Sequence, residues 1–249
     1  MPIRLAQIHE WNKVQDFCTN TFQWGDYIED VWDSWVKSKS LLVYEDNDTI
    51  LGICNVVTHN TEAWIEGLRV DVAARRRHIG KSLLRAAEEA AIQQGATYSR
   101  SAIESSNMPS LQMYHMAGYK IEQKWYMYRC DAQPHATYDI IKPVPKHMQP
   151  NRYVNSWIWV NTNNISPDHI LHMPDGPVFV LSDSDRFPNT LMVTIYNNAK
   201  HDINDTIHYI SNLAYNKNQS VQIFSTDIIR HKALHDHNST ITVVLKQIS

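Results

Sequence analysis

The segment that decides the fold lies at residues 64–84 and reads WIEGLRVDVAARRRHIGKSLL. Its first part is predicted to be a β-strand that ends near Val70, and Gly67 in mid-strand is compatible with a bulge. A helix is expected from about Ile79 to Gln94, because apolar residues recur there at helical spacing. Gly95 is well placed to end that helix. The segment therefore predicts a strand, a short basic loop and a helix in direct succession.

The loop at residues 75–82 is predicted to bind an anion. The N-terminus of a helix presents unpaired backbone N–H groups at the positive end of the helix dipole, and Gly80 lets a phosphate approach the backbone. Arg75, Arg76, Arg77 and Lys81 add positive charge, although a run of charges by itself is typical of a solvated face. Together these features fit a pyrophosphate best. The segment is neither a Walker loop nor a dinucleotide fingerprint, because both the Walker frame and the Gly-x-Gly-x-x-Gly pattern are absent from it.

A second motif follows at residues 103–119, which read IESSNMPSLQMYHMAGY. Residues 77–82 resemble the pyrophosphate loop of GNAT-type N-acetyltransferases, Arg/Gln-x-x-Gly-x-Gly/Ala, with Ser82 in place of the last small residue. The second motif resembles the stretch Asn-x-x-Ala-x-x-Leu-Tyr-x-x-x-Gly-Phe of the same family. The matching positions are Asn107, Ser110, Met113, Tyr114, Gly118 and Tyr119. The resemblance covers about residues 1–130, and Trp24, Tyr27 and Trp35 add a similarity to histidine and small-amine acetyltransferases.

The resemblance implies an α/β (mixed α+β) fold with a central, mostly antiparallel sheet and flanking helices. Acetyl-CoA is the implied co-substrate, in a V-shaped opening between the strand that ends at Val70 and the strand Tyr98–Ile103. The residues implied to bind acetyl-CoA are Leu68, Arg69, Val70, Arg75, Arg76, Arg77, His78, Ile79, Gly80, Lys81, Ser82 and Asn107.

The resemblance also implies an N-acetyltransferase in which an amine attacks the thioester directly. Glu66 is the implied general base and Tyr114 the implied general acid for the leaving thiolate, with a backbone N–H of Leu68–Val70 at the oxyanion. Alternatives stay open. Glu66 could be exposed or paired with Arg69, Tyr114 could be a core aromatic, and the rival bases are water, Glu29, Asp30 and Glu62.

The expected acceptor is a small primary amine or amino acid, with Trp24 and Tyr27 as candidate residues of the acceptor pocket. A protein N-terminus or a lysine is the rival acceptor. A noncatalytic acyl-CoA-binding regulatory module is the rival from another class of protein.

The two halves of the chain differ, because six of the seven glycines precede residue 120. We expect an acetyltransferase domain at 1–131, a Pro-rich linker at 132–150 and a smaller, noncatalytic α+β domain at 151–249. The last domain is expected to contain helices at Asp205–Tyr215 and Asp227–His235 between strands, like a degenerate half of the same fold. Asn197–Asp205 has no arginine and no glycine, so this half is expected to bind no CoA. An unrelated α+β domain is the alternative.

Composition limits the class of protein. The chain has 249 residues, is 43% hydrophobic and carries a formal charge of −3, which argues for a folded protein and against a general nucleic-acid binder. We see no apolar run of membrane-spanning length and no leader peptide, so a cytoplasmic location without membrane partners is expected, with a homodimer as one option. No metal is expected. A site at His231 and His235 is the alternative, and surface histidines are the preferred interpretation.

Overall fold

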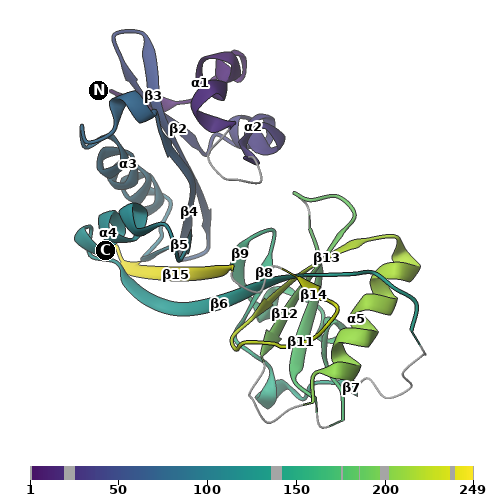
Figure 1. Ribbon diagram of the computed structural model, residues 1–249. Coiled ribbons are helices and arrows are strands. Elements are labelled where there is room, and N and C mark those ends of the chain that lie inside the picture. The colour runs from purple at the N-terminus through teal and green to yellow at the C-terminus, as the bar shows by residue number, and fades with distance from the viewer. Residues whose placement is uncertain are drawn as a thin grey trace. The chain divides into compact units, whose positions relative to one another are not determined.

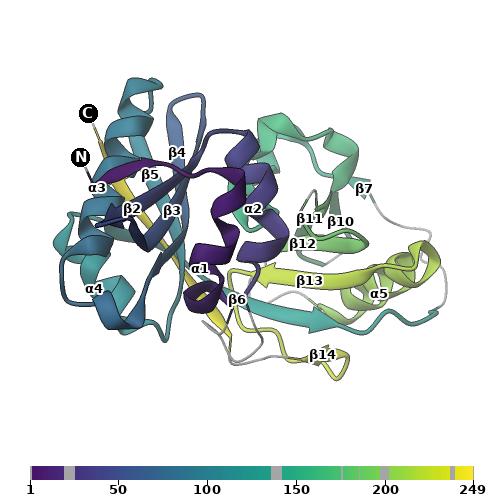
Figure 2. The same ribbon diagram turned by 90° about the horizontal axis from the view of Figure 1, so that it is seen from above.

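A computed structural model of the chain describes residues 2–19, 26–135, 142–174, 176–184, 186–196, 202–235 and 239–248. These residues form two compact units, which are described separately (Figures 1 and 2). Unit 1 contains Met1–Ser101, Met108–Ile121 and Val244–Ser249, and unit 2 contains Ala102–Asn107 and Glu122–Val243. Within the described residues, no helix is both long and apolar enough to cross a membrane.

Unit 1 is built on a mostly antiparallel sheet. Its first strands, in sheet order, are β1 (Ile3–Leu5), β2 (Leu41–Asp46), β3 (Thr49–His59), β4 (Glu62–Val70) and β5 (Tyr98–Glu104). Neighbours are antiparallel up to β4, and β5 runs parallel to β4. The helices are α1 (Trp11–Cys18), α2 (Ile28–Lys37), α3 (Ile79–Gln93) and α4 (Met108–Met116). The expected fold class, a mostly antiparallel sheet with flanking helices, is confirmed.

The helices of unit 1 divide between the two faces of the sheet (Figure 1). α1 and α2 cover one face, where Trp32 and Trp35 of α2 are buried against Val43 and Ile53 of the sheet. α3 and α4 lie on the other face. An added Cβ at Gly52 of β3 would lie 3.0 Å from Leu83 and 3.1 Å from Ile79 of α3. α2 and α3 therefore each bury one apolar stripe, as their 3.6-residue spacing predicts.

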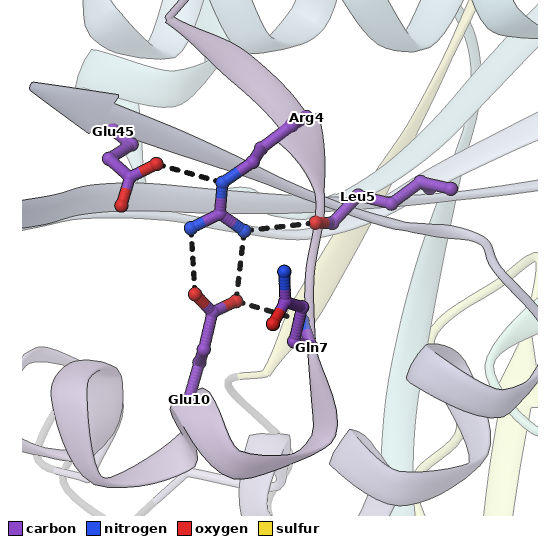
Figure 3. A network of polar contacts seen from close by, with 5 residues as sticks. All are labelled: Arg4, Leu5, Gln7, Glu10 and Glu45. Carbon is purple, nitrogen blue, oxygen red and sulfur yellow. Dashed lines mark hydrogen bonds and ion pairs between the residues drawn. The ribbon is translucent and has the colours of Figure 1, made fainter. Parts of the chain in front are cut away.

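Arg4 joins the first strand to the first helical turn and to β2 (Figure 3). Its guanidinium donates to both carboxylate oxygens of Glu10, at 2.7 and 3.0 Å, and to Glu45 at 2.8 Å. Glu10 is only 2% exposed and also accepts the backbone N–H of Gln7 at 2.8 Å. A buried carboxylate is tolerated here because a bidentate pair with the guanidinium and one backbone N–H supply its hydrogen bonds.

Unit 2 is also mixed α and β. The strands of its main sheet, in order, are β6 (Lys120–Cys130), β13 (Ser220–Ser225), β12 (Thr190–Tyr196), β11 (Val178–Asp183), β10 (Ile170–His172) and β7 (Lys142–Pro143). β14 (Leu234–His235) also pairs with β6, and β8 (Arg152–Asn155) forms a separate hairpin with β9 (Ile158–Asn161). α5 (Asn204–Lys217) connects β12 to its parallel neighbour β13. The unit therefore contains a parallel β-α-β segment, the same arrangement as β4-α3-β5.

Three strands have residues in both units. β5 passes from unit 1 to unit 2 after Ser101, β6 after Ile121, and β15 (Thr240–Gln247) passes back into unit 1 at Val244. In unit 1, Ile248 N donates to Thr97 O at 2.9 Å, and Lys246 Nζ binds the Glu88 carboxylate at 2.8 Å. The compact units therefore differ from the sequential division at residue 131, which stays a prediction.

The prediction of a helix at Asp227–His235 is wrong. This stretch is irregular and ends in the short strand β14. The hydroxyl of Tyr128 accepts the N–H of Ile229 at 2.8 Å, and the Ser225 hydroxyl accepts that of Asp227 at 3.3 Å. These side-chain acceptors and the buried position of Ile229 outweigh a weak helical pattern. Strands β7, β8, β10 and β14 have only two to four residues, too short for their alternation to be recognised.

β4 carries a bulge at the position expected from Gly67. Ile53 pairs with Arg69 and Asn55 pairs with Glu66, so two residues of β4 oppose Cys54 alone. Gly67 has a φ of +61°, and an added Cβ would lie 2.6 Å from the ring of Trp35. Glycine is therefore required twice, by the backbone conformation and by the indole that packs on it.

We expect Gly67→Ala to destabilise the protein more than a glycine substitution in open space. Gly95 has a φ of +90° but no atom within 4 Å of an added Cβ, so Gly95→Ala should cost only backbone strain, about 1 kcal/mol. Gly67→Ala should lower the free energy of unfolding by about 1–3 kcal/mol more, because the methyl group overpacks against Trp35. Urea titration of both variants measures the difference, and equal losses would contradict the packing argument.

Candidate active site

The basic loop has the geometry of an anion site. β4 ends at Val70, and a short 3₁₀ turn (Val72–Ala74) follows, in which the Asp71 carboxylate accepts the N–H of Ala73 at 2.9 Å. Arg76 and His78 then adopt left-handed conformations with φ values of 63° and 62°. His78 is the N-cap of α3. Non-glycine residues in this region are strained, and such strain concentrates at functional loops.

The backbone amides of this loop are available to a ligand. In the described part of the chain, the N–H groups of residues 76–81 donate to no protein acceptor, and the first helical bond runs from Ser82 N to His78 O at 3.0 Å. The side chains of Arg75, Arg76, Arg77 and Lys81 are exposed. Arg77 also pairs with Asp46 at 2.7 Å, where both groups remain partly exposed. These unpaired donors at the positive end of a 15-residue helix fit a pyrophosphate.

Gly80 brings the two sequence motifs together. An added Cβ on Gly80 would lie 3.1 Å from Met113 Sδ of α4, and 3.6 Å from both Leu68 and Val70 of β4. The loop motif therefore packs directly against the helix of the second motif and against the strand that precedes it. Asn107 lies immediately before α4, and its N–H donates to Glu104 O at 2.9 Å.

β4 and β5 pair over only part of their length. Their ladder joins Glu62 to Tyr98, Ala63 to Ser99 and Trp64 to Arg100. β4 continues to Val70, and among the described residues its segment 65–70 has a ladder partner only in β3. One edge of this segment, which includes Leu68 and Val70, is therefore left to bind something other than a strand.

Glu66 lies in this segment, on the face of the sheet that α1 and α2 cover. It is half-buried, and Asn55 Nδ2 donates to its Oε1 at 3.0 Å. Asn55 and Ile53 point to the same face because strand side chains alternate, and Ile53 packs with α2. The carboxylate and the anion-binding loop are thus positioned by one strand on opposite faces of the sheet.

Arg69 has a structural partner that the sequence did not reveal. Its guanidinium binds both oxygens of Asp26, at 2.8 and 2.9 Å. The Asp26 side chain is fully buried and that of Arg69 is 10% exposed. The Tyr27 ring lies 5.6 Å from the Arg69 guanidinium carbon, and an edge contact joins it to Trp35. With its side chain engaged in this way, Arg69 reaches acetyl-CoA through its backbone if at all.

Tyr114 is buried on α4, with 3% exposure. Its hydroxyl bonds with Ser101, and its ring makes an edge contact with Tyr119 at 4.9 Å between centroids. Burial, together with the nearby Cys54, raises the pKa of Tyr114 well above its ordinary value. The phenol therefore keeps its proton at every pH at which the protein would work. Trp24 lies outside the described residues.

Asn55 and Asp26 are the residues of this region that motif reasoning missed. Neither belongs to the two motifs, and each gains its role from a partner 11 or 43 positions away in the sequence. The described residues contain no group of three or more His, Cys, Asp or Glu side chains arranged to hold a metal ion.

An amide-lined basic loop beside a partly unpaired strand, with a half-buried carboxylate across the sheet, is the arrangement expected of a CoA-dependent acyltransferase. A family model agrees. The model of the acetyltransferase (GNAT) family matches residues 5–119. The resemblance found in the sequence is thereby confirmed for residues 5–119, which match the GNAT acetyltransferase family.

Two solved structures resemble nearly the whole chain. One is described as a "putative acetyltransferase" from Thermoplasma acidophilum, with a TM-score of 0.70, 13% identity, and coverage of 99% of this chain and 100% of the other. The second, described in the same words, is from Pyrococcus horikoshii. It has a TM-score of 0.61, 12% identity, and coverage of 99% and 89%. At these identities the likeness shows the fold alone. No curated protein matches the chain in sequence.

We expect Arg77→Ala to weaken CoA binding about fivefold, because the loop loses one charged donor worth about 1 kcal/mol. Arg85→Ala is the matched control. Arg85 is exposed on α3 and pairs with Glu89, so its removal should leave affinity unchanged. Isothermal titration with CoA measures both, and equal affinities for wild type and Arg77→Ala would argue against a pyrophosphate contact.

Proposed function

We propose that the protein transfers the acetyl group of acetyl-CoA to the primary amine of a small amine or amino acid. One observation carries the proposal. A single strand, β4, leads into the anion-binding loop at residues 76–81 and presents the half-buried carboxylate of Glu66 on the opposite face of the sheet. The cofactor and the acceptor can then approach the same strand from opposite faces and meet at its unpaired edge.

The chemistry proposed is direct transfer. An ammonium ion cannot attack a thioester, so Glu66 takes a proton from the acceptor before or during attack. The new C–N bond forms first, and a backbone N–H of Leu68–Val70 stabilises the oxyanion of the tetrahedral intermediate. The C–S bond then breaks, and the nitrogen loses a second proton, which balances the proton that the leaving thiolate takes up. An acyl-cysteine route is disfavoured at Cys54, which is fully buried. Burial raises the pKa of the Cys54 thiol, so the reactive thiolate is not formed.

Tyr114 is proposed as the donor of the proton that the leaving thiolate takes up. Its raised pKa keeps the phenol protonated, which a general acid requires. The phenol belongs to α4, the helix that packs on Gly80 of the anion-binding loop. This contact links the general acid to the segment proposed to hold the pyrophosphate.

A small acceptor is favoured by the burial around the proposed base. Asn55 is fully buried and Glu66 is half-buried beneath α1 and α2, so a slender primary amine fits better than a bulky group. Tyr27, which contacts Arg69 and Trp35, is proposed as part of the acceptor pocket.

Unit 2 is proposed to be noncatalytic. Its β12-α5-β13 segment repeats the arrangement of β4-α3-β5. The sequence between β12 and α5, however, has neither the arginines nor the glycine of the loop at residues 75–82, so a pyrophosphate would find no comparable site there.

The proposed function is tested by incubating the protein with isotope-labelled acetyl-CoA and a pool of amines and amino acids. Mass spectrometry should detect a labelled product whose mass names the acceptor. A parallel incubation uses a pool of peptides. Label on a peptide N-terminus or on a lysine there would show that the acceptor is a protein and not a small amine. If acetyl-CoA stays intact in both pools while the protein still binds CoA, the noncatalytic regulatory module is supported and an enzymatic function is rejected.

We expect Tyr114→Phe to lower kcat about a hundredfold while leaving KM for acetyl-CoA nearly unchanged. Tyr119→Phe is the control, because it removes an equally buried hydroxyl, bonded to Ser99 at 2.6 Å, from outside the proposed chemistry. Because the pKa of Tyr114 is raised, the phenol should keep its proton below about pH 10. Ionisation of Tyr114 should therefore not lower kcat of the wild type below that pH. Equal kcat for both variants would remove Tyr114 from the mechanism.

A further inference from the structure

A polar residue outside both motifs lies directly beside the proposed base. Asn55 is in the middle of β3, is 0% exposed, and is the cross-strand partner of Glu66. Its neighbours along β3 are apolar or weakly polar, Cys54 and Val56, and its partner on β2 is the buried Leu41. A fully buried amide at such a position needs hydrogen-bond partners.

Among the described residues, only the nitrogen of the Asn55 side-chain amide has a hydrogen-bond partner. Nδ2 donates to Glu66 Oε1 at 3.0 Å. The opposite orientation of the amide would set two acceptor oxygens against each other, so chemistry fixes Nδ2 toward the carboxylate. Oδ1 is left buried and, among the described residues, without a hydrogen-bond donor.

The unsatisfied oxygen marks a place for a donor from outside the chain. A buried carbonyl without a donor is costly, and in folded proteins such groups usually hold an internal water. The charged and titratable groups around Oδ1 supply no donor to it among the described residues. The Glu66 carboxylate is an acceptor, the Cys54 thiol donates to the backbone O of Asn55 at 3.9 Å, and the Arg69 guanidinium is engaged by Asp26. A water bound to Oδ1 would have the Glu66 carboxylate within reach as a second partner.

We propose that Asn55 is a positioning residue for Glu66, and that its Oδ1 holds a water through which Glu66 takes the proton of the acceptor. The inference rests on the proposed function. The ammonium gives one proton to the water, and the water gives one to the Glu66 carboxylate, so a neutral amine and a carboxylic acid result and the water is regenerated. The Nδ2 donor fixes the carboxylate, and Oδ1 fixes the water between it and the amine.

A double-mutant cycle tests the positioning role with the acceptor found by labelling. Asn55→Leu keeps the size of the side chain but removes both hydrogen bonds. It should lower kcat about tenfold, leave KM for acetyl-CoA unchanged, and move the acidic limb of the pH profile to higher pH. In the Glu66→Gln background the same substitution should cause no further loss, because Asn55 acts only through Glu66. Equal losses in both backgrounds would show a structural role and overturn the proposal.

Thr58→Val is the matched control, since the Thr58 hydroxyl is also buried on β3 and lacks a donor or acceptor among the described residues. It should leave kcat and the pH profile unchanged. Asn55→Asp adds a second carboxylate beside Glu66 and should also move the acidic limb upward, because like charges favour the protonated form. This variant serves if Asn55→Leu does not fold.

A high-resolution crystal structure of the wild-type protein provides a readout that needs no turnover. It should show a water within hydrogen-bond distance of Asn55 Oδ1 and of the Glu66 carboxylate. An empty Oδ1 or a protein donor there would overturn the proposal even for an active enzyme. If the crystal structure shows this water but neither pool yields an acetylated product, the proposed function is rejected. The water site would still stand in that case.

Discussion

The contact between Gly67 and Trp35 is the constraint on which the rest of the site depends. Because an indole occupies the space of a side chain at Gly67, β4 bulges there and places two residues opposite Cys54. A bulge changes the alternation of a strand. It allows Glu66 to point toward α1 and α2, while Leu68 and Val70 pack against the first turn of α3. The Glu66 carboxylate and the residues that pack on the first turn of α3 thereby lie on separate faces of one strand.

Electrostatics follows from this separation. The exposed basic loop and the unpaired amides make a positive region at the start of α3, and the half-buried carboxylate lies across the sheet. Were the arginines of the loop adjacent to Glu66, they would pair with its carboxylate. The one arginine on that face, among the described residues of β4, is Arg69, and it is held by the fully buried Asp26. A buried pair of this kind costs desolvation of both charges, and here it keeps a guanidinium engaged on the face of the sheet that carries Glu66.

The two compact units are connected by more than a linker. Unit 1 includes Val244–Ser249 from the end of the chain, and unit 2 includes Glu122–Cys130 from the strand that ends the GNAT-like segment. Lys246 reaches the carboxylate of Glu88 on α3, so the last strand contributes to the helix that carries the anion-binding loop. Such pairings between distant parts of a sequence raise contact order and slow folding. They also make the last residues of the chain, from Val244, part of unit 1.

The sequence by itself determined the strand, loop and helix of residues 64–84, the second motif and the acetyltransferase family, because these depend on local patterns of residues close together in the chain. It also indicated the bulge, since a lone glycine inside a strand often marks one. The tertiary structure alone decided the partners of Glu66 and Arg69, which come from Asn55 and Asp26. It also decided that residues 227–235 form no helix and that β15 passes from unit 2 into unit 1 at Val244. Contacts between residues far apart in sequence decide these features, and a local pattern carries no record of them.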